Sequence, residues 1–200
     1  MLTSMLVEDG AVVRRISIGD DPELLIEHLR EEYETFAPDI IITSGGISHG
    51  KYEVVRNAIA MAPSLGLPIP LSWFGHVSQQ PGGPQGVNVL DFNGHRLPMI
   101  SFPGNPVSTL ISYVLMLRPY LRAGGPYGTP HEVASRMATL ENAPRGVLVI
   151  DKPLTAPANK RQFLRGNLAM VESEPGTYRV ELYPDVLPGS HLLHHAATAD

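Results

Sequence analysis

Two apolar runs that each end in a turn rich in glycine or proline constrain the fold of this chain most strongly. The first run covers residues 39–43 and stops at Ser44-Gly45-Gly46, and the second covers residues 97–102 and stops at Pro103-Gly104-Asn105-Pro106. Apolar residues at helical spacing follow each turn, over residues 54–61 and 107–121. A short continuous apolar run is typical of a central parallel strand that is buried on both faces. The order strand, turn, helix therefore predicts an α/β fold, with a parallel sheet and helices on both of its faces.

A further helix is predicted ahead of the first run. Apolar residues recur at helical spacing over residues 23–33, and Asp20-Asp21-Pro22 just before them supplies an N-cap and a proline for the first turn. Residues 2–6 are also helix-like, so the sequence opens on a helix.

The pattern changes after a segment rich in glycine and proline, residues 123–130, which we interpret as a linker. Short, partly alternating runs follow at residues 146–150, 162–164 and 178–182, separated by Pro, Gly and Asn. Such runs favour a small all-β domain. We therefore predict an α/β domain over residues 1–125 and a β-domain over residues 126–200.

Composition narrows the possible functions. The formal net charge is −5, from 20 acidic and 15 basic side chains. The chain thus lacks the excess of positive charge that binding to nucleic acid or anionic lipid requires. The sequence contains no Cys, which excludes disulfides, thiolate metal sites and cysteine nucleophiles. No segment reaches the roughly 18 apolar residues that a membrane span needs. We interpret the chain as cytoplasmic, with no nucleic-acid or membrane partner.

Ligands of doubly wound sheets bind beyond the carboxyl ends of the strands, where both turns are expected. At Ser44-Gly45-Gly46 the missing side chains would let a phosphate or pterin approach the backbone, although a glycine pair after a strand is also typical of a plain tight turn. In the second turn, two prolines fix the backbone around Gly104 and Asn105. Its alternative interpretation is a stiffened helix start, with Asn105 as N-cap and Pro106 in the first helical position.

Three motifs in order carry a resemblance to a known family: residues 43–48 (Thr-Ser-Gly-Gly-Ile-Ser), 81–86 (Pro-Gly-Gly-Pro-Gln-Gly) and 102–108 (Phe-Pro-Gly-Asn-Pro-Val-Ser). Their order and spacing resemble the molybdopterin molybdenumtransferases, which include the bacterial MoeA proteins and the E domain of gephyrin. Residues 162–166 and 189–193 are similar to the β-barrel motifs of that family. The resemblance implies a three-layer molybdopterin-binding domain followed by a small, partial β-barrel.

The family resemblance also implies an activity. Adenylylated molybdopterin and molybdate would be the substrates of a Mg²⁺-dependent reaction, in which molybdenum enters the dithiolene and AMP leaves. Asp20 would orient the Mg²⁺ and act with Pro103 and Pro106 as the catalytic set. The implied cofactor-binding residues are Ser44, Gly45, Gly46, Gly104, Asn105, Ser108, Arg165 and Ser190. Pairing through the α/β domain implies a homodimer.

Several of these residues also have a purely structural interpretation. Asp20 suits a helix N-cap, and Arg165 suits the edge of a strand. Trp73 and Phe74 are expected in the core. The cluster His191, His194 and His195 is interpreted as a solvated turn rather than a metal site.

The sequence departs from the family pattern in three places. Gln80 and Gly83 stand where many members carry lysines. Residues 48–53 replace a more acidic family sequence, so His49 or Lys51 could supply the lost positive charge, or could belong to a solvated loop. The family's Gly-Asp-Glu-Leu strand end, a source of carboxylates, has no match here. We therefore expect the chain alone to be poorly active, and a non-catalytic binding module or scaffold is the alternative function.

Overall fold

The structure, a computed structural model, describes residues 1–47, 53–132, 134–135, 146–149, 154–155, 157–171 and 178–182. Among these residues, no helix combines the length and the apolar character that crossing a membrane requires.

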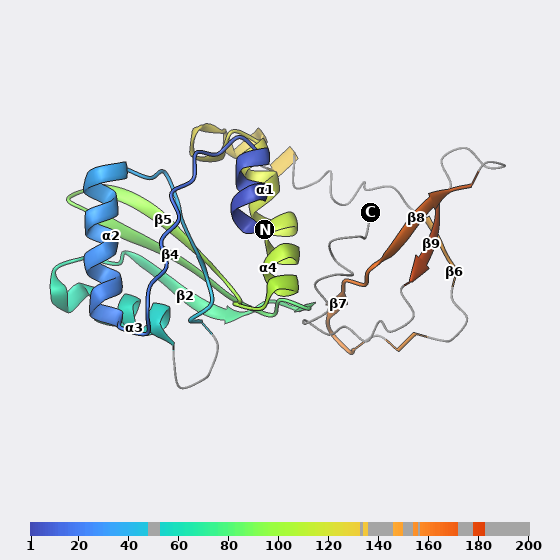
Figure 1. Cartoon of the computed structure of the whole chain (residues 1–200), viewed down its shortest axis with the longest axis horizontal. Coiled ribbons are helices and arrows are strands. Elements are labelled where there is room, and N and C mark those ends of the chain that lie inside the picture. Colours follow the sequence, from blue (N-terminus) through green and yellow to red (C-terminus); the bar gives the residue numbers. More distant parts are fainter. Residues whose placement is uncertain are drawn as a thin grey trace.

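A four-stranded sheet forms the centre of the N-terminal part (Figure 1). Its strands lie in the order β1 (Ile41–Ser44), β5 (His95–Phe102), β4 (Pro84–Phe92) and β2 (Leu71–His76). Only β1 and β5 are parallel, whereas β5, β4 and β2 pair antiparallel. The α/β class is confirmed, but the expectation of a parallel sheet is wrong beyond this one pair.

The antiparallel pairing of β4 and β5 follows from a two-residue turn. Asn93 and Gly94 connect the strands with φ values of 56° and 94°, and Phe92 faces His95 across the closing pair. An Asn-Gly pair with positive φ at both positions is the turn that matches the right-handed twist of a hairpin. The hairpin therefore accounts for the mixed sheet.

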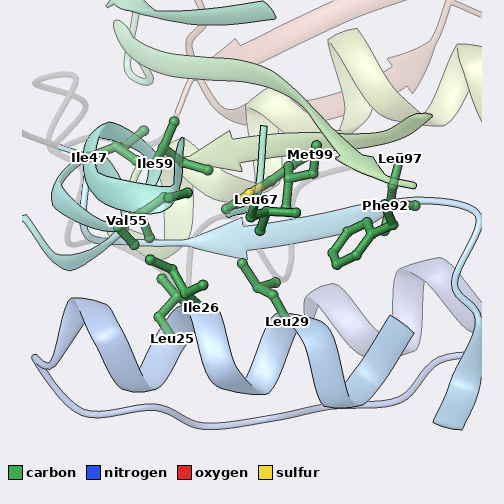
Figure 2. Packing of buried hydrophobic residues seen from close by; sticks show 13 residues of the cluster. Leu25, Ile26, Leu29, Ile47, Val55, Ile59, Leu67, Phe92, Leu97 and Met99 are labelled. Atoms are coloured by element: carbon green, nitrogen blue, oxygen red, sulfur yellow. The ribbon is translucent and has the colours of Figure 1, made fainter. Parts of the chain in front are cut away.

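Helices cover both faces of the sheet, as predicted. Helices α2 (Pro22–Phe36) and α3 (Val54–Met61) lie on one side, and α1 (Leu2–Glu8) and α4 (Pro106–Ser112) lie on the other (Figure 1). Figure 2 shows the first layer, where side chains of α2 and α3 pack against those of β4 and β5. A second, separate cluster joins α1 and β5 to the π-helical turn that follows α4, through Leu6, Phe102, Tyr113 and Leu117.

The apolar run over residues 107–121 forms one long helical rod in three sections. Helix α4 passes into a π-helical turn over Tyr113–Leu117, which leads into α5 (Arg118–Arg122). Pro119 has no backbone N–H and its ring collides with the carbonyl four residues earlier, so a regular α-helix cannot continue through this point. The widened turn before Pro119 accommodates the proline without ending the rod.

Two expectations about individual residues need correction. The run at 39–43 was expected to form a central strand, but β1 starts at Ile41 and lies at the edge of the described sheet, where its first three residues are half-buried. Trp73 was expected in the core, but it is 43% exposed because it points from β2 to the face of the sheet opposite the main cluster. Phe74, its neighbour on the other face, packs against that cluster as expected.

Two smaller sheets involve the C-terminal part. Strand β3 (Gln79–Gln80) pairs parallel with β7 (Arg161–Gln162), and β6 (Gly146–Val149), β9 (Tyr178–Leu182) and β8 (Gly166–Met170) form a three-stranded sheet. Short 3₁₀ turns occupy Ala62–Leu65 and Gly125–Tyr127. Small sheets after the α/β domain are thus present, while the barrel and the domain boundaries stay predictions.

Candidate functional site

The two turns singled out in the sequence meet where β1 and β5 end. Ser44 and Phe102 are register partners, and the Gly45 N–H donates to the Phe102 carbonyl oxygen at 2.9 Å. A Cβ atom placed on Gly104 would lie 3.1 Å from the Gly45 Cα. The turns are therefore in backbone-to-backbone contact, which a side chain at Gly104 would disrupt.

A network of hydroxyl groups holds this contact in place. The Thr109 hydroxyl donates to the carbonyl oxygen of Pro103 at 2.6 Å, or to that of Asn105 at 3.0 Å. Its oxygen lies 3.2 Å from the Ser44 Oγ, which connects the end of β1 to the first turns of α4. Thr109 is buried, so these hydrogen bonds replace hydration that the polar groups have lost.

The second turn continues directly into helix α4. Asn105 is the N-cap of α4, its side-chain oxygen accepts from the Val107 N–H at 3.1 Å, and Pro106 takes the first helical position. The helix-start interpretation of this turn is thus confirmed. On the other turn, Gly46 has a φ of 70°, and a Cβ atom there would lie 3.0 Å from side-chain atoms of both Val54 and Val55. Only glycine fits at that position.

The third motif, residues 81–86, reaches the opposite side of α4. Gly82 has a φ of 93°, and its carbonyl oxygen accepts from the Gln85 Nε2 at 2.8 Å. The same nitrogen lies 2.6 Å from the Ser112 Oγ, and a Cβ atom on Gly82 would lie 3.3 Å from the Ser108 carbonyl oxygen. All three motifs therefore meet at α4, the first two at its start and the third along Ser108 and Ser112.

A cleft of about 810 Å³ opens at the paired turns. We call the part next to the turns the strand-end cleft; it is lined by Asp20, Ser44, Gly45, Gly46, Gly104 and Pro106. The interpretation of Asp20 as the N-cap of α2 is wrong. The N-cap is Asp21, whose carboxylate accepts from the Glu23 and Leu24 N–H groups. Asp20 is left exposed at the cleft.

Other residues of the predicted set lie outside the lining of this cleft. Pro103 and Asn105 accept hydrogen bonds from residues of α4: the Pro103 carbonyl oxygen from the Thr109 hydroxyl, and the Asn105 side-chain oxygen from the Val107 N–H. Ser108 is buried beside the third motif. Arg165 is 8% exposed and follows β7, which pairs with β3 next to Gln80. The structure thus brings part of the set together.

Several candidates lie outside the described residues: His49, Lys51, Ser190 and the histidines 191, 194 and 195.

The described residues do not fit a complete Mg²⁺ site. Among them there is no group of three or more His, Asp or Glu side chains that could hold a metal ion. The carboxylates that line the cleft are Asp20 and Glu32, and Glu32 is already paired with Arg14 at 3.0 Å. We derive no step of a reaction through Mg²⁺ from this arrangement.

Sequence reasoning missed three hydroxyl groups at the strand ends. Thr109 forms the network described above, and Thr43 and Ser101 are cross-strand partners whose buried hydroxyls have no hydrogen-bond partner within the described part of the chain. The signal for Thr109 was its place four residues after the N-cap, where a hydroxyl can bond the carbonyl one turn back. The pairing of Thr43 with Ser101 depends on strand register, which the sequence does not show.

We expect the substitution Thr109→Val to destabilise the fold by about 1–3 kcal/mol, because it leaves buried carbonyl and hydroxyl oxygens without their donor. Chemical unfolding in urea measures this change. Thr109→Ser is the matched control, since it keeps the hydroxyl, and it should lie much closer to the wild type. Equal unfolding midpoints for the Val variant and the wild type would contradict the proposed network.

Comparison with known proteins gives consistent matches. A family model described as "probable molybdopterin binding domain" matches residues 1–123. Over 200 residues the chain is 34% identical to molybdopterin molybdenumtransferase 2 of Mycobacterium tuberculosis, covering 100% of this chain and 44% of that protein. It is 28% identical to molybdopterin molybdenumtransferase 1 of the same organism, over 95% of this chain and 40% of the relative.

A shorter match of 32% identity links 45% of the chain to 13% of gephyrin from Dictyostelium discoideum. The chain thus spans less than half the length of these curated relatives.

Proposed function

The chain belongs to the molybdopterin-binding domain family, and on this basis we propose that it binds molybdopterin at the strand-end cleft and serves molybdenum cofactor biosynthesis. The observation that carries the proposal is the contact between Gly45 and Gly104. It leaves a surface of bare backbone at the end of two parallel strands, beside the start of α4. Such a surface suits a flat ring that carries a phosphate, because no side chain holds the ligand away.

We further propose the reaction that the molybdenumtransferase relatives suggest. A bound water would attack the phosphoanhydride bond of adenylylated molybdopterin, which would release AMP and leave the molybdopterin phosphate. The two dithiolene thiols would bind molybdenum, and their two protons would leave with one oxygen of molybdate as water. In this proposal, the backbone of Ser44, Gly45, Gly46 and Gly104 holds the pterin or its phosphate, and Pro106 shapes the molybdate side of the cleft. Asp20 is the carboxylate at this cleft that would orient a bound water.

Anaerobic calorimetry tests this function. The chain is titrated with molybdopterin and with adenylylated molybdopterin, and AMP release is then followed chromatographically with molybdate and Mg²⁺ present. Saturable binding with AMP release supports the full activity. Binding without release supports the alternative, a non-catalytic molybdopterin-binding module. Absence of binding to either compound contradicts the proposal and leaves the scaffold role.

We also propose that the longer protein of this family type forms a homodimer. Sedimentation of a full-length relative measures this directly. A stable monomer at high protein concentration would count against the proposal.

Substitutions at Asn105 separate capping from ligand binding. Asn105→Asp keeps a capping oxygen but adds a negative charge beside the strand-end cleft, so we expect nearly unchanged stability and a loss of affinity for anionic molybdopterin of about tenfold. Asn105→Ser caps the helix without the charge and should keep both properties. Calorimetry and thermal unfolding of the two variants provide the comparison. An Asp variant that binds as tightly as the Ser variant would place the anion elsewhere.

A further inference from the structure

Ser44 brings a side-chain hydroxyl to the strand-end cleft. It is the last residue of β1, it is exposed, and it is part of the cleft lining. A serine hydroxyl has one hydrogen that it can donate and two lone pairs that can accept. The position of this single hydrogen therefore decides which kind of ligand group Ser44 can bind.

The neighbouring hydroxyl, that of Thr109, has already used its own hydrogen. The Thr109 Oγ1 lies 2.6 Å from the Pro103 carbonyl oxygen and 3.0 Å from the Asn105 carbonyl oxygen. A carbonyl oxygen can only accept, so the one hydrogen of Thr109 is directed to these two atoms. The 3.2 Å contact between the hydroxyls of Thr109 and Ser44 is then made with the hydrogen of Ser44.

The hydrogen of Ser44 is thereby held by the protein. Its other acceptor is again the Pro103 carbonyl oxygen, at 3.5 Å, so both of its partners belong to the second turn and α4. Thr109 is only 2% exposed, and turning the Ser44 hydrogen toward a ligand would break a hydrogen bond to this buried oxygen, which costs free energy. The lone pairs of the Ser44 Oγ are left for the ligand.

The peptide group next to Ser44 is also committed. The Gly45 N–H donates to the Phe102 carbonyl oxygen at 2.9 Å, so this N–H does not bind a ligand oxygen. At this point the end of β1 thus offers an acceptor, the Ser44 Oγ, whereas the hydrogens of Ser44, Gly45 and Thr109 are all bonded within the protein.

We propose, on the basis of the proposed function, that the Ser44 Oγ accepts a hydrogen bond from the exocyclic amino group of the pterin ring, and that the phosphate of molybdopterin lies elsewhere in the cleft. A phosphate oxygen would turn its own lone pairs and negative charge toward those of Ser44, which is repulsive. An amino group on the edge of a pterin carries two hydrogens, and it can reach Ser44 while the face of the ring rests on the bare backbone of Gly45 and Gly104. Ser44 therefore selects the orientation of the ligand.

Anaerobic calorimetry of Ser44→Ala in the full 200-residue chain tests which part of the ligand meets this residue. The ligands are molybdopterin and hydroxymethylpterin, which has the ring without the phosphate and the dithiolene; its weaker binding is followed by ligand-observed NMR. We expect the variant to bind both ligands about threefold to tenfold more weakly than the wild type, because each loses one hydrogen bond. A loss that is confined to molybdopterin would place the phosphate or the dithiolene at Ser44 and overturn the proposal.

An analogue of hydroxymethylpterin that lacks the exocyclic amino group tests the direction of the hydrogen bond. It keeps the acceptors of the ring, so it should bind the wild type more weakly than hydroxymethylpterin by the factor that Ser44→Ala produces. It should lose nothing further in the variant. If this analogue binds the wild type as tightly as hydroxymethylpterin, the Ser44 hydroxyl does not accept from the amino group and the proposal is wrong.

Two controls separate this contact from other effects of the substitution. Ser64→Ala removes an exposed hydroxyl that donates to the Met61 carbonyl oxygen at 2.7 Å, outside the cleft lining, and it should bind all ligands like the wild type. AMP also carries an amino group, on adenine, and its affinity should be the same for Ser44→Ala and the wild type. Weaker binding of AMP with unchanged binding of hydroxymethylpterin would make adenine the partner of Ser44 and overturn the proposal.

Failure of this proposal is distinguishable from failure of the proposed function. If the wild type and Ser44→Ala bind molybdopterin equally tightly, the role of Ser44 is refuted while molybdopterin binding stands. A wild type that binds molybdopterin but not hydroxymethylpterin at millimolar concentration would refute it as well, since the ring would not be held on its own. Absence of molybdopterin binding to the wild type would contradict the proposed function, and the role of Ser44 with it.

Discussion

Replacing Gly104 by Val is expected to reduce molybdopterin binding by more than about a hundredfold, the largest effect on binding predicted for this chain. A Cβ atom at this position would lie 3.1 Å from the Gly45 Cα, so the backbone itself, rather than a movable side chain, must shift. The two turns would separate, and the branched side chain would fill the bare surface where the ligand is placed. Calorimetric titration of the variant measures the loss.

The control for this substitution is Gly19→Ala. Gly19 precedes Asp20, which lines the cleft. A Cβ atom on Gly19 would have no heavy atom within 4 Å, and the φ of Gly19 lies outside the left-handed region. We expect unchanged binding for this variant. If Gly104→Val binds molybdopterin as tightly as Gly19→Ala, the ligand does not rest on the paired turns.

Replacing Asp9 by Asn is expected to cost about 2–3 kcal/mol of stability. The Asp9 side chain is only 1% exposed; it accepts hydrogen bonds from Tyr113, from Arg118 Nε at 2.8 Å and from Arg122 Nε at 2.9 Å. These contacts hold α1 against the π-helical turn and α5. The loss stays moderate because the guanidinium groups of Arg118 and Arg122 are partly exposed to solvent.

The contribution of Asp9 to the stability of the fold should depend on pH. Burial alone would raise the pKa of the Asp9 carboxyl, but the hydrogen bonds from Tyr113, Arg118 and Arg122 outweigh it and lower this pKa below its ordinary value of 3.8. The same cluster, through burial first and then the Asp9 charge, raises the pKa of Tyr113 to about 12. A carboxyl with a lowered pKa stabilises the fold above its unfolded-state pKa and loses this contribution as the pH falls through the folded-state pKa.

Urea unfolding of the wild type and Asp9→Asn at several pH values checks this account. The difference in unfolding free energy should be full near neutral pH and should shrink below about pH 4. Asp39→Asn is the matched control, because Asp39 accepts from the Tyr127 hydroxyl at an exposed site. It should change stability by less than about 0.5 kcal/mol. A difference for Asp9→Asn that does not vary with pH would contradict the charge-based explanation.

The sequence predicted those elements whose patterns are local. Helices α2 and α3 and strand β5 were found because their apolar spacing and terminal residues agree. Strand β4 was missed because its alternation is broken by Asn88, a fully buried polar residue. The Ser72 hydroxyl on the neighbouring strand donates to the Asn88 side-chain oxygen at 2.8 Å, while the buried Asn88 side-chain nitrogen has no hydrogen-bond partner among the described residues. A cross-strand partner of this kind cannot be recognised before the register is known.

For the candidate site, too, the sequence predicted the local features but not the contacts between distant segments. Both glycine turns were identified from local sequence, and their apposition follows once β1 and β5 are parallel neighbours. The assignment of the α2 cap was ambiguous between Asp20 and Asp21, although a proline in the first helical position makes the residue directly before it the cap. The Thr109 network depends on contacts between segments far apart in sequence, so only the structure reveals it.

NMR of the chain labelled with ¹⁵N-glycine tests the central claim most directly, because it reports which backbone amides contact added molybdopterin. We predict that the amide signals of Gly45, Gly46 and Gly104 shift in a saturable manner. The signal of Gly94, which lies in the β4–β5 turn at the other end of β5, should stay in place. Saturable shifts at other glycines, with Gly45, Gly46 and Gly104 unchanged, would contradict it.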